Sequence, residues 1–330
     1  MTSTGLTRAF AVAAAGVVAL TACETPDDTN GNGEDIAGGD LTLATGSTGG
    51  TYYPLGGEIA NLWTESLEDV SVSTQATGAS VDNMYLLDSG ENELVMAVNG
   101  TAQNAVAGAG DFGDEPLDDP DAVRAIGNVY PEVMQVTTVE DSGVESIEDL
   151  DGARVELGPP GSATEVLAQQ ILDAYDVEPS ETFDSAFGDA ATNLGDGQVD
   201  AAFGVLGVPD ASLTEIATTN DIHMLDIEGD ALDEVLAADD SLVPHEIPAG
   251  TYEGQDDPHH TVTNWATLYG PSNLSDDLVY DLVSTMYGQA DDLEHDVAGE
   301  IQLDTAVEGL GDIELHPGAE QYYEEEGALD

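Results

Sequence analysis

Two loops rich in glycine, serine and threonine are the segments of the sequence best suited to chemistry. The first, residues 46–50, reads GSTGG, and the second, residues 158–162, reads GPPGS. Each loop follows a short apolar segment and precedes a segment whose apolar residues recur with the period of a helix. Such a loop leaves the first amide groups of the helix without partners, with the positive end of the helix dipole behind them. We therefore expect anions to bind at these loops.

The two loops do not have the sequence of a nucleotide site. Residues 46–50 are not followed by Lys-Ser or Lys-Thr, and their glycines lack the G-x-G-x-x-G spacing. For either loop alone, a tight turn without a ligand is an equally good interpretation. One loop occurs in each half of the chain, however, and ligands of open α/β sheets bind beyond the carboxyl ends of the strands. We therefore favour a cleft lined by both loops.

The arginines and the paired histidines have better structural explanations. Arg124 and Arg154 could contact an anionic ligand, but an ion pair with one of the many acids is the favoured interpretation. His259 and His260 stand beside two aspartates and could ligate a metal. Adjacent histidines in a proline-bounded loop are more often exposed to solvent, so we expect no metal and no cofactor.

Aromatic side chains could form the walls of the cleft. Tyr52 is the best placed of them, because it directly follows the first loop. Packing in the core or on the surface is an equally good explanation for Tyr53, Tyr130, Phe203 and Tyr252.

Motifs for catalysis are absent from the sequence. It contains no G-x-S-x-G and no H-E-x-x-H, and its single cysteine lies near the N-terminus. Ser162 follows a glycine at the start of an expected helix, but no histidine nearby in the sequence could activate it. We expect a protein that is not an enzyme, with a secreted hydrolase as a minority alternative.

The N-terminal segment resembles a lipoprotein signal peptide over residues 1–22. It has one cation, Arg8, and an apolar run over residues 9–20 that is too short to span a bilayer. Residues 20–23 read LTAC, which resembles the motif in which Cys23 would carry a lipid. We expect an extracytoplasmic protein held on the outer face of the cytoplasmic membrane by this lipid, with residues 23–39 as an acidic flexible tether. An uncut anchor helix or an ordinary signal peptide remains open.

The charge of the chain excludes two classes of partner. Its 330 residues include 3 Lys and Arg against 68 Asp and Glu, a formal net charge of −65. Binding to nucleic acid or directly to an anionic membrane surface needs many cations, so neither is expected. Because 41% of the residues are hydrophobic and follow regular periods, we expect a folded chain. Salt at about 1 M shortens the Debye length to about 3 Å, so such self-repulsion indicates adaptation to high salt.

Strand and helix patterns alternate from residue 40 onward. The expected strands cover residues 41–45, 70–76, 94–98, 133–139, 155–157, 199–203, 223–227 and 261–268. Helices are expected after both loops, over residues 80–88, 100–107 and 275–290, after Pro209 and before residue 238. This alternation implies an α/β fold with a parallel sheet that helices cover on both faces.

Several collinear segments are similar to a known family. Residues 45–56 read TGSTGGTYYPLG and resemble the opening signature of the TAXI family of TRAP-transporter solute receptors. The similarity continues through residues 77–83, 150–155, 158–165, 196–201, 207–209, 247–252 and 316–320. Ala79 and Ala163 stand where the family usually has glycine.

The resemblance implies a periplasmic-binding-protein-like fold of type II, with two parallel or mixed-sheet lobes joined by hinge strands around a ligand cleft. We expect residues 40–132 and 249–330 to form one lobe and residues 133–248 to form the other. The expected ligand-binding residues are Ser47, Thr48, Gly49, Gly50, Tyr52, Thr77, Ser80, Gly161, Ser162, Ala163, Thr164 and Phe203.

The resemblance also implies a function and its partners. A monomeric receptor would close on a small carboxylate, such as glutamate or 2-oxoglutarate, and deliver it to a TRAP-type membrane permease. The lipid would be its one attachment to the membrane. The ligand-sensing lobe of a signalling system remains the main alternative.

Overall fold

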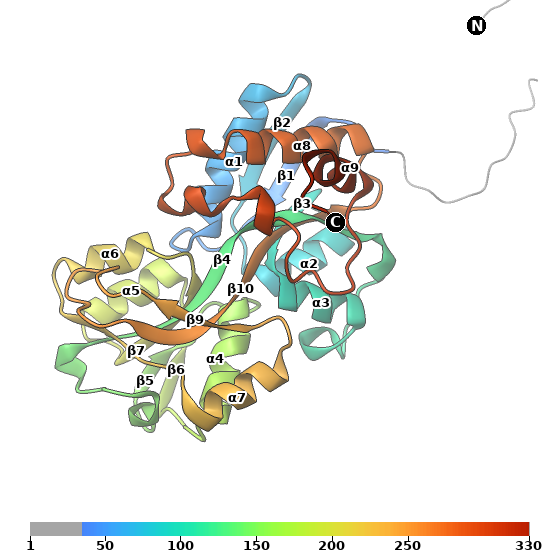
Figure 1. Ribbon diagram of the computed structural model, residues 1–330. Helices are drawn as coiled ribbons and strands as arrows, with labels where there is room; N and C mark the ends of the chain where they lie inside the picture. The colour runs from blue at the N-terminus through green and yellow to red at the C-terminus, as the bar shows by residue number, and fades with distance from the viewer. Residues whose placement is uncertain (1–34, 330) are drawn as a thin grey trace, which may run out of the picture. The chain divides into compact units, whose positions relative to one another are not determined.

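Residues 35–329 are described by a computed structural model, in which a mixed β-sheet runs through the whole folded body. Its strands are β1 (Gly39–Ala44), β2 (Val70–Gln75), β3 (Leu94–Val98), β4 (Val123–Val139), β5 (Arg154–Glu156), β6 (Glu181–Phe183), β7 (Ala201–Leu206), β8 (Ile222–Met224), β9 (Val243–Ile247) and β10 (His259–Pro271). The order is β2-β1-β3-β10-β4-β7-β5-β6, with β8 beside β4 and β9 beside β10. Figure 1 shows β4 and β10 passing through the centre.

Nine α-helices of the described residues cover this sheet. They are α1 (Tyr52–Ser66), α2 (Ser80–Asp88), α3 (Asn99–Ala107), α4 (Ala163–Ala174), α5 (Phe187–Gly195), α6 (Ala211–Ala217), α7 (Gly229–Ala238), α8 (Asp276–Gly288) and α9 (Pro317–Glu326). The pairs β1–β2, β1–β3, β5–β6 and β5–β7 are parallel, whereas the pairs that involve β4 or β10 are antiparallel. The sheet is therefore mixed, and its parallel parts lie on either side of the β4–β10 pair.

Alternate residues of the strands pack against helices on opposite faces. In β3, Leu94 and Met96 pack in one core with α1, α8 and α9, whereas Val95 and Ala97 pack in another with α2 and α3. In β7, Phe203 packs with α4 and α7, whereas Ala202 packs with α5 and α6. This alternation follows from the period of two in a strand, and it gives each half of the sheet two apolar cores. The α/β fold expected from the sequence is confirmed.

Strand β4 differs from the sequence prediction. The prediction began a strand at residue 133, after Tyr130-Pro131, but the strand runs without a break through Pro131. From Val123 to Val133, β4 pairs with β10. From Val133 to Thr138, it pairs with β7. The proline is tolerated because long-range pairing on both sides of it holds the strand extended, which a local pattern does not reveal. β6, α5, β9 and α9 were also not predicted.

The N-terminal predictions fall largely outside the described residues. Residues 1–34, which include the expected signal peptide and lipid-bearing Cys23, are not described, and neither is residue 330. Within the expected tether, Ile36 forms a bridge with Leu274, and β1 begins at Gly39. Across residues 35–329, no helix is both long and apolar enough to cross a membrane. The lobe boundaries and the tether stay predictions.

Candidate functional site

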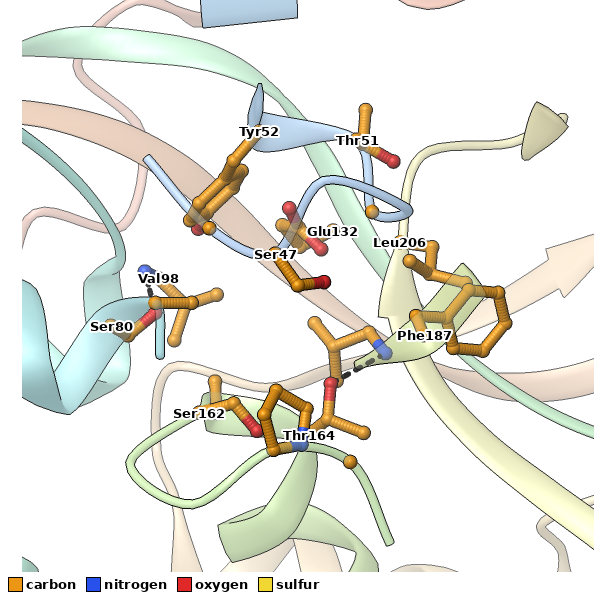
Figure 2. A pocket seen from close by; sticks show the side chains of 17 residues that line it. Ser47, Thr51, Tyr52, Ser80, Val98, Glu132, Ser162, Thr164, Phe187 and Leu206 are labelled. Carbon is orange, nitrogen blue, oxygen red and sulfur yellow. Dashed lines mark hydrogen bonds between the residues drawn. The ribbon is translucent and has the colours of Figure 1, made fainter. Parts of the chain in front are cut away.

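A cavity lies where the two halves of the sheet meet at β4 and the two glycine-rich loops face each other (Figure 2). Its lining residues come from the β1–α1 loop, the starts of α2, α4 and α5, the ends of β3 and β7, and β4. They are Gly46, Ser47, Gly50, Thr51, Tyr52, Ala79, Ser80, Val98, Glu132, Gly158, Pro159, Ser162, Ala163, Thr164, Phe187, Val205 and Leu206. The cavity thus occupies the position beyond strand ends where α/β sheets bind ligands.

The cavity is small. It offers about 50 Å³ for the centres of water-sized molecules. At about 10–15 Å³ for each water, this corresponds to roughly four water molecules. In the conformation described, the cavity is therefore too small for a peptide or a nucleotide, and an organic acid with more than a few non-hydrogen atoms has to widen it.

Four helices begin at the cavity wall. Tyr52, Ser80, Ala163 and Phe187 are the first residues of α1, α2, α4 and α5, and all four line the cavity. The first amide groups of a helix have no acceptor within that helix, and the dipole adds partial positive charge at this end. The wall is therefore polarised toward an anion although no lysine, arginine or histidine is among the described lining residues.

Four hydroxyl groups of the wall share one hydrogen-bonding pattern: each accepts a hydrogen bond from a backbone amide. The pairs are Val98 N–H to Ser80 Oγ (3.1 Å), Glu165 N–H to Ser162 Oγ (3.1 Å), Val205 N–H to Thr164 Oγ1 (3.0 Å) and Gly207 N–H to Thr51 Oγ1 (2.9 Å). Dashed lines in Figure 2 mark the bonds at Ser80 and Thr164. A hydroxyl that accepts from an amide keeps its own proton for a different acceptor. Each of these wall hydroxyls therefore has a proton that it can donate to a ligand.

Contacts across the cavity hold the two halves together. Gly161 O accepts from the Val81 amide at 2.9 Å, so the second loop caps α2 of the other half. Ser212 Oγ donates to Gly49 O at 3.0 Å. Gly49 also lies against the start of α5, where a Cβ atom on it would stand 2.3 Å from Gly188 N. The conformation described is thus one in which the loops of both halves touch.

The sequence-predicted binding residues separate into two groups in space. Those that line the cavity are Ser47, Gly50, Tyr52, Ser80, Ser162, Ala163 and Thr164. Those that do not are Thr48, Gly49, Thr77, Gly161 and Phe203. The binding role of all twelve stays a prediction.

The residues outside the wall have other contacts. Gly49 and Gly161 join the two halves, as described above. The Thr77 hydroxyl hydrogen-bonds Asn83 Oδ1 at 2.6 Å, and Phe203 is fully buried in the core under α4 and α7. Ala79, where the TAXI family usually has glycine, has φ 77°, in the left-handed region that glycine adopts at lower cost.

The arginines and histidines considered above lie away from the cavity wall. Arg124 pairs with Glu314 at 3.2 Å and Arg154 with Asp200 at 2.6 Å, in agreement with the structural interpretation favoured from the sequence. No group of three or more metal-binding side chains occurs among residues 35–329.

Sequence reasoning missed two prominent residues of the wall. Phe187 begins α5, a helix that was not predicted. Glu132 lies on β4, next to the position where the sequence prediction broke the strand. The one available signal for Glu132 was an acidic residue inside an otherwise apolar run, since an ionisable group is rarely buried without a reason.

Glu132 is buried in an environment that disfavours its charge. It is 3% exposed, its Oε1 accepts a hydrogen bond from the Tyr130 hydroxyl, and its Oε2 has no hydrogen-bond partner among the described residues. Burial, opposed by the Tyr130 hydrogen bond and assisted by the charge of Asp210, raises the pKa of Glu132 to about 8. The carboxyl group is therefore mostly neutral at pH 7.

Two α/β halves that share long central strands, with a cavity between facing loops, define a periplasmic-binding-protein-like fold. The chain belongs to the NMT1-like family, whose model matches residues 43–327. A solved structure described as a periplasmic transporter is similar over 87% of this chain and 92% of its own, at 16% identity and a TM-score of 0.53. The structure of MatC from Rhodopseudomonas palustris with bound malate is similar over 88% of this chain and 99% of its own, at 14% identity and a TM-score of 0.51. At these identities the structural likeness establishes the fold.

Proposed function

We propose that this protein is an extracytoplasmic solute-binding receptor for a small carboxylate. The observation that carries the proposal is the set of four hydroxyl groups in the cavity wall, each of which accepts one hydrogen bond from a backbone amide and keeps its own proton for another acceptor. These donors lie at the N-termini of α1, α2 and α4, and donors at helix N-termini stabilise an anion. The described cavity is smaller than malate, 2-oxoglutarate or glutamate, so the proposal includes a widening of the cavity when such an acid binds.

The binding energy needs no cationic side chain. Hydrogen bonds to a charged group contribute about 1.5–3 kcal/mol each, and a helix N-terminus contributes roughly 0.3–2 kcal/mol, before ordering costs. A micromolar dissociation constant requires about 8 kcal/mol. Four such hydrogen bonds sum to about 6–12 kcal/mol before ordering costs, a range that includes this value.

Delivery to a TRAP-type permease is the partner role we propose, on the similarity of the segments around residues 45–56 and 158–165 to the TAXI family. Malate bound to MatC supports a carboxylate as the ligand class. Glutamate and 2-oxoglutarate remain the candidates that the TAXI resemblance suggests. A lipid at Cys23 would hold the receptor near its permease at the membrane.

Ligand binding would act on an equilibrium between open and closed forms. The contacts of Gly49 with Ser212 and of Gly161 with Val81 join segments from opposite halves, and opening the cavity breaks them. A ligand that touches both loops favours the closed form by the difference in its affinity for the two forms.

A thermal-shift screen in molar KCl tests the proposed function. Pyruvate, L-malate, 2-oxoglutarate and L-glutamate are compared with dimethyl malate, which has no carboxylate. Binding raises the free energy of unfolding by RT ln(1 + [L]/Kd), about 2.7 kcal/mol at a hundredfold excess over Kd. We expect at least one acid to raise the melting temperature and the ester to have no effect. No shift with any of the four acids would contradict the proposal.

Ser162→Ala tests the hydroxyl donors, with Ser275→Ala as the matched control. Both serines cap a helix, accepting from Glu165 N–H and Leu278 N–H, and each substitution should cost about 1 kcal/mol of stability. Only Ser162 lines the cavity. We expect Ser162→Ala to weaken binding of the acid about 10- to 100-fold in calorimetry, because a charge-assisted bond is lost, and Ser275→Ala to leave Kd unchanged. If both variants changed Kd equally, the Ser162 hydroxyl would act only as a helix cap.

A further inference from the structure

Glu132 is the one carboxyl group in the described wall of a cavity that otherwise presents donors. Figure 2 draws its side chain among those of the wall, and Glu132 lies near enough to Tyr52 to raise the pKa of the Tyr52 hydroxyl. An ionised Glu132 would place a negative charge beside a bound carboxylate, and no cation among the lining residues would separate the two. The carboxylate site is therefore incomplete as long as Glu132 is charged.

The hydrogen bonds of Glu132 leave one oxygen for a ligand. Oε1 accepts from the Tyr130 hydroxyl, which leaves Oε2 as the atom that holds the proton of the neutral group. Oε2 has no partner among the described residues, although it is fully buried. The hydroxyl of Tyr52, also in the wall, is buried and makes no hydrogen bond of ordinary geometry, although the Ser80 hydroxyl lies near enough to lower its pKa. A buried polar atom without a partner is costly, and a ligand with two carboxylate oxygens would supply acceptors for both groups.

Burial and the charge of Asp210 favour the neutral form of Glu132, and the hydrogen bond from Tyr130 opposes them. Tyr130 on β4 and Tyr52 at the start of α1 are both buried, and for each hydroxyl burial, followed by the charge of Glu132, raises the pKa well above its usual value. Asp210, which caps α6, adds a negative charge that raises the pKa of Glu132 further. Tyr269 on β10 also raises the pKa of Tyr52. These neighbours supply no positive charge.

Resting on the carboxylate-receptor function proposed above, we propose that Glu132 binds the ligand as a neutral carboxylic acid. Its Oε2–H donates a hydrogen bond to one oxygen of the bound carboxylate, and the Tyr52 hydroxyl donates a second. No bond is made or broken in the ligand. When Glu132 is ionised in the ligand-free receptor, it takes a proton from solvent as the ligand binds. The receptor then takes up one anion together with one proton. The ligand is an acid with an ionised carboxylate, and an ammonium group has no partner at this position.

Isothermal titration calorimetry at pH 7 and pH 9 in molar KCl tests the proposal, with pyruvate, L-malate and 2-oxoglutarate as probes. None of these acids has a group that titrates in this interval. Asp210, whose pKa burial raises to about 6 against the opposing effect of backbone hydrogen bonds, has largely ionised by pH 7. With the pKa of Glu132 at about 8, the fraction of receptor with neutral Glu132 falls about tenfold from pH 7 to pH 9. Because only this form binds the ligand, Kd rises by the same factor.

Proton uptake gives a second measurement on the unaltered protein. Titrations in two buffers of different ionisation enthalpy count the protons bound with each ligand. We expect close to one proton per ligand at pH 9 and close to none at pH 7. This result does not depend on any variant being folded.

Glu132→Gln removes the titration and keeps a donor. The amide of the substituted side chain can accept from Tyr130 and donate to the ligand, so we expect the same Kd at pH 7 and pH 9, no proton uptake, and tighter binding than wild type at pH 9. Glu156→Gln is the matched control. Glu156 is equally buried, accepts hydrogen bonds from Ser185 and Asn193, and does not line the cavity. This control should keep the tenfold pH dependence.

The outcomes separate this proposal from the proposed function. Binding of an acid with equal Kd at both pH values, or without proton uptake at pH 9, overturns the role of Glu132 and leaves the receptor function standing. Binding of L-glutamate that strengthens with pH, while 2-oxoglutarate does not bind, overturns it in favour of an ionised Glu132 paired with an ammonium group. No binding by any of these acids overturns both proposals.

Discussion

Single side chains determine what kind of ligand the cavity can hold. In water, the hydroxyls of Ser80, Ser162 and Thr164 would donate and accept hydrogen bonds equally well. In the protein, each accepts one hydrogen bond from a backbone amide, which occupies one of its two lone pairs and leaves its proton for another acceptor. An ionised Glu132 can only accept hydrogen bonds, whereas a neutral Glu132 can donate one to a ligand, as the hydroxyls can. The selectivity of the wall for an anion thus depends on one proton.

The same proton links the stability of the ligand-free protein to pH. Because folding raises the pKa of Glu132 from about 4.3 in an unfolded chain to about 8, the folded state holds more protons between these values. The contribution of Glu132 to stability is therefore fully present below about pH 4 and is lost as pH rises toward 8. Relative to wild type, Glu132→Gln should gain stability between pH 5 and pH 9, by up to a few kcal/mol. Melting temperatures at both pH values check this, and an equal difference at pH 5 and pH 9 would contradict the raised pKa.

The long strands β4 and β10 are the elements that bring the two halves to one site. β4 pairs with β10 in the first half and with β7 in the second, and Glu132 lies where the partners change. Each half adds loops at the carboxyl ends of its own parallel strands. The cavity closes only when the first loop approaches the start of α5 without an intervening side chain, and Gly49 and Gly188 permit this.

Gly49→Ala tests the contact between these elements. The new Cβ atom would lie 2.3 Å from Gly188 N and cannot be accommodated without moving the loop. We expect ligand affinity to fall at least tenfold in calorimetry, with an unchanged circular dichroism spectrum. Gly57→Ala, in α1, is the control, because a Cβ atom there meets nothing within 4 Å, and it should bind the ligand like wild type. Normal affinity in Gly49→Ala would mean that binding does not need the described contact.

The charge of the whole molecule governs where this fold is stable. The net charge of −65 is distributed over a chain with three arginines and no lysine. The two described arginines pair with Glu314 and Asp200, so most of the acids among the described residues have no arginine partner. Mutual repulsion of these acids opposes the compact state.

Salt should therefore stabilise the protein by screening. We expect the melting temperature to rise steadily as KCl increases from 0.1 M to 3 M, because the Debye length falls from about 10 Å to below about 3 Å. Sucrose at 1 M is the control, since it strengthens apolar burial without screening charge. At 0.1 M KCl, sucrose should not restore the melting temperature that the protein has in 3 M KCl. A melting temperature independent of KCl would contradict adaptation to high salt.

Local patterns were sufficient for much of the fold. The helix over residues 80–88 and the strand over residues 94–98 lie where the sequence predicts them, because their apolar periods and their boundaries are local properties. The passage through Pro131 was not predictable in this way, because the strand there is held by pairing with β10, more than a hundred residues away. The start of α5 was missed for lack of a strong boundary signal, and Phe187 was missed with it.

By itself, the sequence determined the alternation of strands and helices, the two loops that open α1 and α4, and the large negative charge. These features depend on neighbouring residues or on composition alone. Tertiary structure decided which loop atoms line a common cavity, which glycines join the halves, and that Glu132 lies buried beside Tyr52 and Tyr130. The physical reason is that burial and proximity across the sheet set the ionisation of Glu132 and the direction of each hydroxyl, and neither is a property of a local segment.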